Sequence, residues 1–284
     1  MVTSQDIAFE ANLISKGRIL ITAFEGWNDA SGAAINSIDH LIAIWQGVKI
    51  DEIDADPYFD FQVTRPEIKL NSQGRREITW PKTTIYSCDT VAGQSIFLLK
   101  GHEPSFNWVD YCREILGLCL ELEIDTIWSL GSLLADVPHT RTIPVNSTSL
   151  SPAIREEFGF DESDYEGPVG ILNVLQDLAQ RADFNTVSTW AAHPHYATVS
   201  PNPKTTLGLV EHISDLLGVD INTLNLELQT QQWEENVSKL VEQDEEISQY
   251  IAVLEKKIDD YRLKQASGES IAREFERYLR RKDN

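Results

Sequence analysis

Cysteine, methionine and long apolar runs are scarce in this chain of 284 residues. Its three cysteines, Cys88, Cys112 and Cys119, contain no Cys-x-x-Cys pair, and an odd number does not fit a disulfide framework. We therefore expect all three to be buried and reduced. No stretch approaches about 18 consecutive apolar residues, and no basic segment precedes an apolar run at the N-terminus. Neither a membrane span nor a signal peptide is expected, which predicts a cytoplasmic protein.

Basic side chains are also few. The sequence holds 24 Lys and Arg against 45 Asp and Glu, a formal net charge of -21. Residues 222–284 carry 14 of the acidic and 10 of the basic side chains, so most of the excess lies in residues 1–221. An electrostatic field of this sign repels phosphate groups, which argues against nucleic-acid and anionic-membrane partners. It favours solubility or a basic protein partner.

Strand-like and helix-like segments alternate over residues 1–220, which predicts an α/β domain with a central, mostly parallel sheet flanked by helices. The first strand, helix and strand, over residues 18–53, imply a parallel pair. Residues 54–82 interrupt the alternation and predict a β-rich excursion or hairpin. The expected strands are residues 18–24, 48–53, 84–88, 95–99, 126–130 and 186–192, and the expected helices are residues 33–45, 108–120, 154–158, 171–182 and 205–217.

Residues 221–284 predict an all-helical extension. From Trp233 to Tyr261 the apolar residues recur alternately four and three positions apart, a heptad pattern in which Asp244 fills one position. A break at residues 265–268 would end this long helix, and a shorter amphipathic helix would follow. A helical hairpin within the chain and a coiled coil between chains both fit the pattern. The shorter helix covers only part of the apolar stripe, so we expect a homo-oligomer with the extension at or beside its interface.

Polar, charged and aromatic side chains that could bind a ligand or a partner follow several of the expected strands. Because parallel strands end at the same edge of a sheet, we expect the loops after them to gather these side chains at one edge, where ligands bind in open α/β sheets. The residues in question are Trp27, Asn28 and Asp29 after the first strand, Glu103 after the strand ending near Leu99, Asp136, His139 and Arg141 after residues 126–130, and His195 and Tyr196 after the last strand.

These loops lack the signatures of common catalytic sites. Residues 25–32 have neither the Gly-Lys-Ser/Thr ending nor the Gly-x-Gly-x-x-Gly spacing of a phosphate loop, and a capped turn is the structural alternative. Residues 131–141 group Ser, Asp, His and Arg without a Gly-x-Ser-x-Gly elbow, and a salt-bridged loop explains them as well. His193 and His195 have no third ligand at a fixed spacing, so we expect no metal, and no cofactor is indicated.

Short motifs also occur along the chain in a characteristic order. They are Gly-Trp-Asn-Asp-Ala at 26–30, Val-Thr-Arg-Pro at 63–66, Trp-Pro at 80–81, Gly-His-Glu-Pro at 101–104, Leu-Gly through Thr-Arg at 130–141, Tyr-Glu-Gly-Pro at 165–168, Trp-Ala-Ala-His-Pro-His-Tyr at 190–196 and Ser-Pro-Asn-Pro-Lys at 200–204. Each motif is weak alone, but the ordered set resembles the proteasome assembly chaperone 2 family, in its longer actinobacterial form with a helical C-terminal extension. The resemblance covers residues 15–280, and His193 is a departure, since an apolar residue is expected there.

The resemblance implies a nucleoside-phosphorylase-like α/β fold and a homo-oligomer, with a trimer favoured. The family takes its name from chaperones that assemble proteasome α-rings, so one implied function is a non-enzymatic protein-interaction or assembly factor acting on proteasome subunits or another protein. The alternative is a small-molecule-binding protein or enzyme that uses the loops at the carboxyl edge of the sheet. An exposed apolar patch would favour the first function and a closed polar pocket the second. The candidate ligand- or partner-binding residues are Trp27, Asn28, Asp29, Arg65, Glu103, Asp136, His139, Arg141, His195 and Tyr196.

Overall fold

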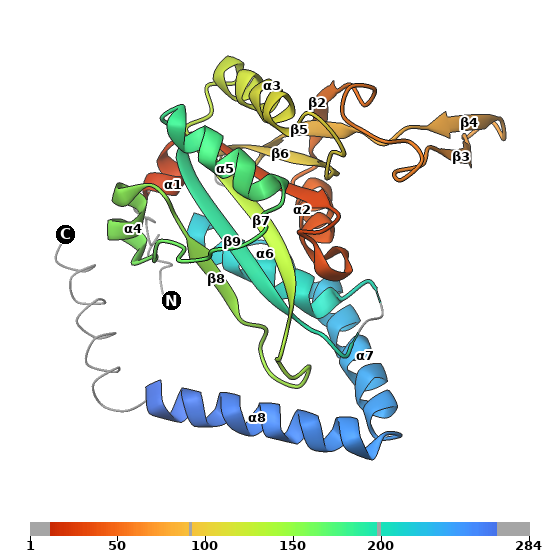
Figure 1. Cartoon of the computed structure of the whole chain (residues 1–284), viewed down its shortest axis with the longest axis vertical. Coiled ribbons are helices and arrows are strands. Elements are labelled where there is room, and N and C mark those ends of the chain that lie inside the picture. Colours follow the sequence, from red (N-terminus) through yellow and green to blue (C-terminus); the bar gives the residue numbers. More distant parts are fainter. Residues whose placement is uncertain (1–11, 91–92, 198–199, 266–284) are drawn as a thin grey trace, which may run out of the picture.

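A seven-stranded sheet forms the centre of the molecule in the computed structural model, which describes residues 12–90, 93–197 and 200–265 (Figure 1). Its strand order is β2-β5-β6-β1-β7-β9-β8. The four central strands β6, β1, β7 and β9 are parallel, whereas β2, β5 and β8 run antiparallel to their neighbours. The predicted mostly parallel sheet is therefore confirmed. The strands are β1 (Ile19–Glu25), β2 (Val48–Ile53), β5 (Thr83–Asp89), β6 (Ser95–His102), β7 (Thr126–Ala135), β8 (Val145–Thr148) and β9 (Asn185–Pro194).

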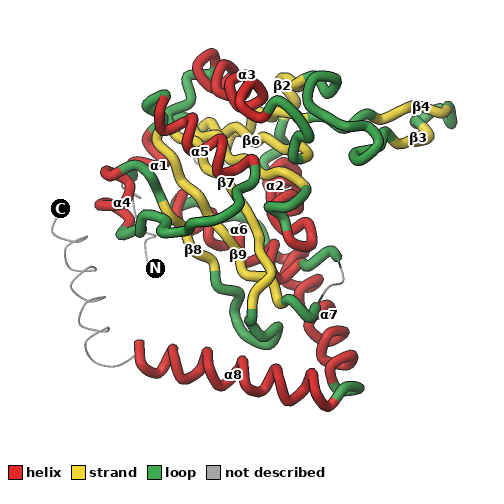
Figure 2. The backbone as a smooth tube through the Cα atoms, in the orientation of Figure 1, coloured by secondary structure: helices red, strands yellow, loops and turns green. Residues whose placement is uncertain are grey.

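Helices cover both faces of this sheet (Figure 2). Alternate side chains of β1 serve the two resulting cores, as the two-residue period of a strand requires. Ile19 and Ile21 pack with α2 and α6, whereas Leu20 and Phe24 pack with α3 and α5. The helices of the domain are α1 (Leu13–Lys16), α2 (Ala33–Ile44), α3 (Trp108–Glu121), α4 (Pro152–Phe158), α5 (Ile171–Arg181) and α6 (Pro203–Leu217).

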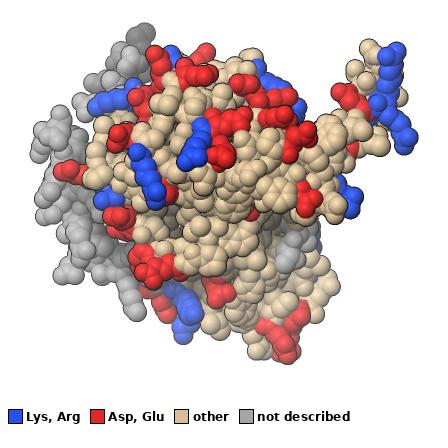
Figure 3. Space-filling view, turned by 45° about the horizontal axis from the view of Figure 1, so that its top comes forward, with Lys and Arg blue, Asp and Glu red and all other residues tan. Residues whose placement is uncertain are grey.

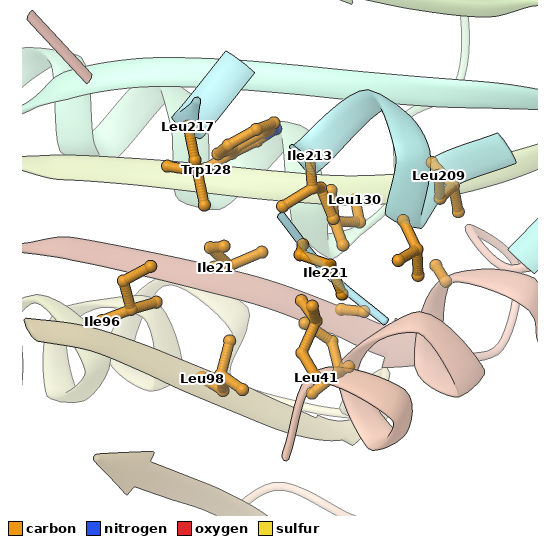
Figure 4. Packing of buried hydrophobic residues seen from close by; sticks show 14 of the residues in the cluster. Ile21, Leu41, Ile96, Leu98, Trp128, Leu130, Leu209, Ile213, Leu217 and Ile221 are labelled. Atoms are coloured by element: carbon orange, nitrogen blue, oxygen red, sulfur yellow. The ribbon is translucent and has the colours of Figure 1, made fainter. Parts of the chain in front are cut away.

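The core beneath α2 and α6 is apolar and closely packed (Figure 4). Sheet residues such as Ile21 and Trp128 meet Leu41 of α2 and Ile213 of α6 there. The indole of Trp128 satisfies its one donor by a 2.8 Å hydrogen bond to Thr189 Oγ1. All three cysteines are buried and free, as predicted, and burial raises the pKa of Cys112 and Cys119 to about 12. Their thiols are therefore protonated and unreactive at neutral pH.

The predicted parallel pairing of the first two strands is wrong. β2 pairs antiparallel with β5 at the edge of the sheet, and β1 lies between β6 and β7. The composition of β2 explains its position at the edge. Half of its residues, Lys49, Asp51 and Glu52, are charged, and only Ile53 is buried. A strand covered by helices on both faces needs apolar side chains on both faces, which β2 lacks.

A two-stranded hairpin interrupts the main sheet, as residues 54–82 predicted. β3 (Glu67–Leu70) pairs antiparallel with β4 (Arg76–Thr79), and the two form a sheet of their own. Every residue of both strands is exposed. The hairpin projects away from the body of the molecule (Figures 1 and 2). We call residues 63–80, which include it, the arm.

The extension differs from the predicted single long helix. α7 (Leu224–Val241) and α8 (Glu245–Gln265) are separate helices joined by residues 242–244. The carboxylate of Asp244 accepts hydrogen bonds from the backbone N–H groups of Glu246 and Ile247, at 3.0 and 3.1 Å, and so caps the amino end of α8. Asp244 interrupts the heptad pattern because it begins a new helix. The predicted shorter helix lies outside the described residues, and no described helix is long and apolar enough to cross a membrane.

Candidate functional site

The strands β1, β6, β7 and β9 end at the same edge of the sheet, so the loops after them carry most of the predicted site residues to that edge (Figure 1). The loops nevertheless serve two different places. Trp27 and Asp29 line an open cleft, with Asn28 and Glu103 beside it. Arg65 lies in the arm and belongs to neither place. The remaining residues, Asp136, His139, Arg141, His195 and Tyr196, contact α7 and α8 or support those contacts.

The cleft has a volume of about 820 Å³ and a largely apolar lining. It lies between the loop after β1, the end of β7 and residues 163–168, which precede α5. Its aromatic side chains are Trp27, Tyr165 and Trp190, and its aliphatic side chains are Leu133 and Leu134. Four of these five are unusually exposed for large apolar residues: Trp27 by 63%, Leu134 by 60%, Tyr165 by 59% and Leu133 by 44%.

Asp29 holds the loop after β1 in place. Its carboxylate accepts hydrogen bonds from the backbone N–H groups of Ala34 at 2.7 Å and Ile35 at 3.0 Å, so it caps the amino end of α2. The Ser132 hydroxyl, at the end of β7, donates a third bond of 2.8 Å to the same carboxylate. Burial raises the pKa of Asp29, although these three hydrogen bonds act in the opposite direction. The loop is therefore the capped turn that the sequence offered as the structural alternative.

Asn28 and Glu103 join this loop to α5. The Asn28 amide donates a 2.9 Å hydrogen bond to Glu103 Oε1, and the backbone N–H of Ile171 donates another of 2.9 Å to the same oxygen. Asn28 is fully buried. A Cβ atom on Gly170 would lie 2.2 Å from Asn28 Oδ1, so only glycine fits there. Glu103 thus fixes the wall of the cleft between β1 and α5.

Ser31 and His193 lie close enough to resemble a catalytic pair, with Ser31 Oγ 3.2 Å from His193 Nδ1. Asn202 decides against that role. Its Oδ1 accepts from the backbone N–H groups of Lys204 and Thr205, which makes Nδ2 the atom that faces His193 Nδ1 at 2.7 Å. The lone pair of Nδ1 therefore accepts from Asn202 and is not free to take a proton from Ser31. Burial also lowers the pKa of His193, which keeps the ring neutral.

His139 connects the loop after β7 to α7. The Tyr196 hydroxyl accepts from the His139 backbone N–H at 2.6 Å and donates to its Nδ1 at 2.8 Å. The other ring nitrogen, Nε2, then carries the proton and donates to Ser238 Oγ on α7 at 3.0 Å. Burial and the nearby Lys204 ammonium lower the pKa of His139. Both ring nitrogens are thus used for holding the extension.

The other loop residues hold α8. Arg141 forms ion pairs with Asp259 at 2.9 Å and with Glu255 at 3.3 Å. The Tyr250 hydroxyl, also on α8, donates a 2.8 Å hydrogen bond to Asp136 and lies 3.0 Å from His195 Nε2. The alternative interpretation of residues 131–141 as a salt-bridged loop therefore describes them better than a ligand site does. Within the described ranges, no group of three or more His, Cys, Asp and Glu side chains could hold a metal ion.

Apart from Trp27, the apolar residues that line the cleft were not among the site residues predicted from the sequence. Tyr165 and Trp190 stand in two of the ordered motifs, and Leu133 and Leu134 stand within a third. A search for titratable groups passes over such residues, because their role depends on exposure, and exposure is a property of the fold. Their presence in motifs without a charged function was the signal that could have found them.

Comparison with known proteins identifies the family. The model of the PAC2 family matches residues 23–241. The chain belongs to the PAC2 family. Among curated proteins none matches this PAC2 chain significantly.

Solved structures of PAC2 proteins are similar over most of the chain. A PAC2 family protein from Streptomyces avermitilis is 38% identical, with a TM-score of 0.76, over 82% of this chain and 99% of that one. A proteasome-assembly chaperone homologue from Mycobacterium tuberculosis is 39% identical, with a TM-score of 0.75, over 82% of this chain and 99% of its own. An archaeal proteasome activator from Pyrococcus furiosus is 14% identical, with a TM-score of 0.65, over 82% and 96%, and shares the fold.

Proposed function

We propose that this PAC2 protein is a non-enzymatic assembly factor that holds a segment of a partner protein in its cleft. The observation that supports this most is the exposed apolar lining, in which Trp27, Leu133, Leu134 and Tyr165 surround one opening. Contiguous exposed apolar side chains with polar neighbours mark protein-binding surfaces. Trp and Tyr are also the residues that contribute most to binding energy at such surfaces.

The polar groups of the cleft support binding more than catalysis. Asp29 caps α2, Ser132 donates to Asp29, and His193 accepts from Asn202. Each therefore already has a structural partner. The alternative function is a small-molecule-binding protein or enzyme that uses the same loops. An enzyme would draw on Ser31 and His193, and the occupied Nδ1 of His193 weighs against it.

Proteasome subunits are the first candidate partners. The similar protein from Mycobacterium tuberculosis is described as a proteasome-assembly chaperone homologue, and the archaeal protein as a proteasome activator. A cytoplasmic location fits such a partner. The proposed role is to present or protect one subunit surface while a ring is assembled.

Binding of purified proteasome subunits from the same organism tests the proposal. Isothermal titration calorimetry would compare the wild-type chain with Trp27→Ala and with Leu120→Ser. Leu120 is a matched control, because it is 67% exposed on α3 and does not line the cleft. We expect Trp27→Ala to weaken binding about 30-fold, the size typical of a hot-spot residue, and Leu120→Ser to leave it unchanged. No binding, or equal binding by all three proteins, would contradict the proposal.

A further inference from the structure

The end of β7 that lines the cleft is paired on one side only. β1 pairs with the beginning of β7, and one isolated bridge between Asp29 and Ser132 follows. The chain then leaves the sheet through the short turn Ala30–Gly32, whereas β7 continues to Ala135. Among the described residues, only β9 pairs with residues 133–135. An unpaired strand edge of this kind is a template for another strand.

Leu134 carries the unpaired backbone groups of this edge. The Ser132 N–H donates to the Asn28 carbonyl at 2.9 Å, on the β1 side, and the Ala135 carbonyl accepts from the His195 N–H at 3.2 Å, on the β9 side. Backbone groups of successive strand residues point to opposite sides, so both the N–H and the C=O of Leu134 point to the β1 side. Neither has a hydrogen-bond partner in the part of the chain that the structure describes.

The cleft encloses this edge from both faces of the sheet. Successive side chains of a strand lie on opposite faces, and both Leu133 and Leu134 line the cleft. Trp190 lies on the face of Leu133, and His193, the register partner of Leu134, lies on the other. A cavity lined from both faces of a strand lies against the edge of that strand. A strand added here would therefore have apolar contacts on both of its faces.

The border of the cleft is acidic. Acidic side chains are spread widely over the body of the molecule (Figure 3). Residues 161–166, which we call the acidic segment, contain Asp161, Glu162, Asp164 and Glu166, all exposed. Two other residues of this segment, Ser163 and Tyr165, line the cleft itself. Glu162 pairs with Arg155 at 3.3 Å, whereas Asp164 and Glu166 form no ion pair within the described residues. The described lining of the cleft includes no Lys or Arg side chain to neutralise them.

We propose that the cleft binds an extended partner segment, with Lys or Arg beside its apolar residues, which pairs as an added strand with the edge of β7. Its backbone bonds to the N–H and C=O of Leu134, its apolar side chains contact Leu133 and Trp190, and its cations reach Asp164 and Glu166. The inference rests on the proposed function, because it defines the conformation and the charge of the segment that the cleft holds.

The hydrogen-bonding groups of the edge favour a strand over a helix as the occupant. A helix satisfies its backbone groups internally, so it has no donor or acceptor to offer Leu134. The charge of the border favours a basic over an acidic occupant. An acidic segment would meet Asp164 and Glu166 at close range in a chain of net charge -21, and like charges in contact weaken binding.

Synthetic peptides test this inference without any proteasome subunit. One array would hold blocked heptapeptides of the form Lys-Arg-x-x-x-Arg-Lys, with x drawn from Ile, Val, Leu, Phe, Tyr and Trp, and a matched array would have the form Glu-Asp-x-x-x-Asp-Glu. We expect the full-length chain to bind members of the basic array. Fluorescence anisotropy should show that the acidic counterpart of the strongest binder binds at least about tenfold more weakly.

A backbone-modified peptide separates strand pairing from side-chain contacts. Methylation of the three central amide nitrogens of the strongest basic peptide removes the donors of a strand but leaves every side chain in place. We expect binding about tenfold weaker or less, the effect of losing one good hydrogen bond or more. The isotope-edited infrared band of the bound, unmethylated peptide should be that of a β-strand.

Variants of the chain test the same contacts from the other side. Leu134→Pro removes the N–H on the cleft side and none of the groups that pair with β9, so it should weaken peptide binding about tenfold. Leu134→Ala is the matched control, because it keeps the N–H, and it should weaken binding less. Equal urea midpoints for the two variants would show that both are folded. Asp164→Asn with Glu166→Gln should weaken binding of the basic peptide and reduce its dependence on salt.

Three results would overturn the inference: binding of neither array, equal binding of both, or undiminished binding of the methylated peptide. Subunit binding that depends on Trp27 would still support the proposed function in each case, because a helical or folded segment could then be the occupant. Conversely, basic peptides that bind as described while the subunits do not would support the inference and remove only the proteasome partner.

Discussion

Arg141 binds Asp259 through two parallel hydrogen bonds, Nε to Oδ1 at 3.0 Å and Nη2 to Oδ2 at 2.9 Å. This forked pair fastens α8 to the loop after β7, which also supplies His139 to α7. The same sheet edge thus positions the cleft and also holds the extension. Only arginine offers the planar pair of donors that this contact uses.

Arg141→Lys should loosen α8 without unfolding the domain. Lysine keeps the charge but loses the second parallel hydrogen bond. Hydrogen exchange followed by mass spectrometry should show faster exchange in residues 245–260 and unchanged exchange in β1 and β7. Arg181→Lys is the matched control, because its pair with Asp177 lies within a single exposed helix turn. Unchanged exchange in α8 would contradict this account of the pair.

Asp244→Ala should destabilise α8 by about 0.5–2 kcal/mol, the usual cost of losing an N-cap, and Asp244→Asn should retain most of the stability. A continuous heptad helix predicts the opposite result. There, alanine is the better helix former and would raise stability. Hydrogen exchange of the first turn of α8 distinguishes the two, and slower exchange in Asp244→Ala would support one continuous helix.

The apolar residues of the heptad pattern differ in exposure along α7, so replacing them by alanine should reduce stability by different amounts. Trp233 is buried with Val237 and Ala197, so Trp233→Ala should cost about 3 kcal/mol. Leu240, at another position of the same stripe, is 59% exposed, and Leu240→Ala should change little. Trp233→Phe should cost less than alanine, because the indole N–H is buried and has no hydrogen-bond partner among the described residues. Urea denaturation measures all three, and equal effects of the two alanine variants would refute this packing.

Acid should destabilise the protein through its histidines. Burial lowers the pKa of His40, His139, His193 and His212, so each binds protons more readily in the unfolded chain. Above about pH 6.5 these rings are neutral in both the folded and the unfolded chain, so they cost no stability. As the pH falls below that value, the unfolded chain binds protons first, and the free energy of unfolding decreases. The free energy of unfolding in urea should therefore decrease from about pH 8 to about pH 5.5.

The variant His139→Gln isolates one of these histidines. It removes the titrating ring between Tyr196 and Ser238, so the decrease in stability on acidification should be smaller than in wild type. Wild-type stability that stays constant or rises over this pH range would contradict the assigned neutral state of these rings.

The sequence predicted the sheet well because its central strands are apolar on both faces, as strands between two layers of helices must be. These strands are parallel, so the loops after them lie at one edge of the sheet. The capping of α2 by Asp29 could also be predicted, because an Asp just before a helix commonly caps it and this signal depends only on neighbouring residues. The position of β2 in the sheet could not be predicted, because strand pairing depends on contacts between residues far apart in the chain. β8 was missed because Val145–Thr148 is short and largely polar.

The site was harder to predict than the fold. Asp136, His139, Arg141, His195 and Tyr196 have the residue types of a ligand site, yet they contact α7 and α8 or support those contacts. Sequence reasoning cannot tell a side chain that binds a ligand from one that binds a distant helix of the same chain. Asp244 shows the same difficulty, since one aspartate fits both a weak heptad position and an N-cap.

The central claim is that the cleft holds a segment of protein, and cross-linking from position 27 tests it most directly. A photoreactive benzophenone side chain would replace Trp27 in the full-length chain, with a second sample labelled at Leu120. The samples would be irradiated alone and with purified proteasome subunits, and the linked peptides identified by mass spectrometry. We predict links from position 27 to one subunit segment when subunits are added. Position 27 yielding no more links to the subunits than position 120 would contradict the claim.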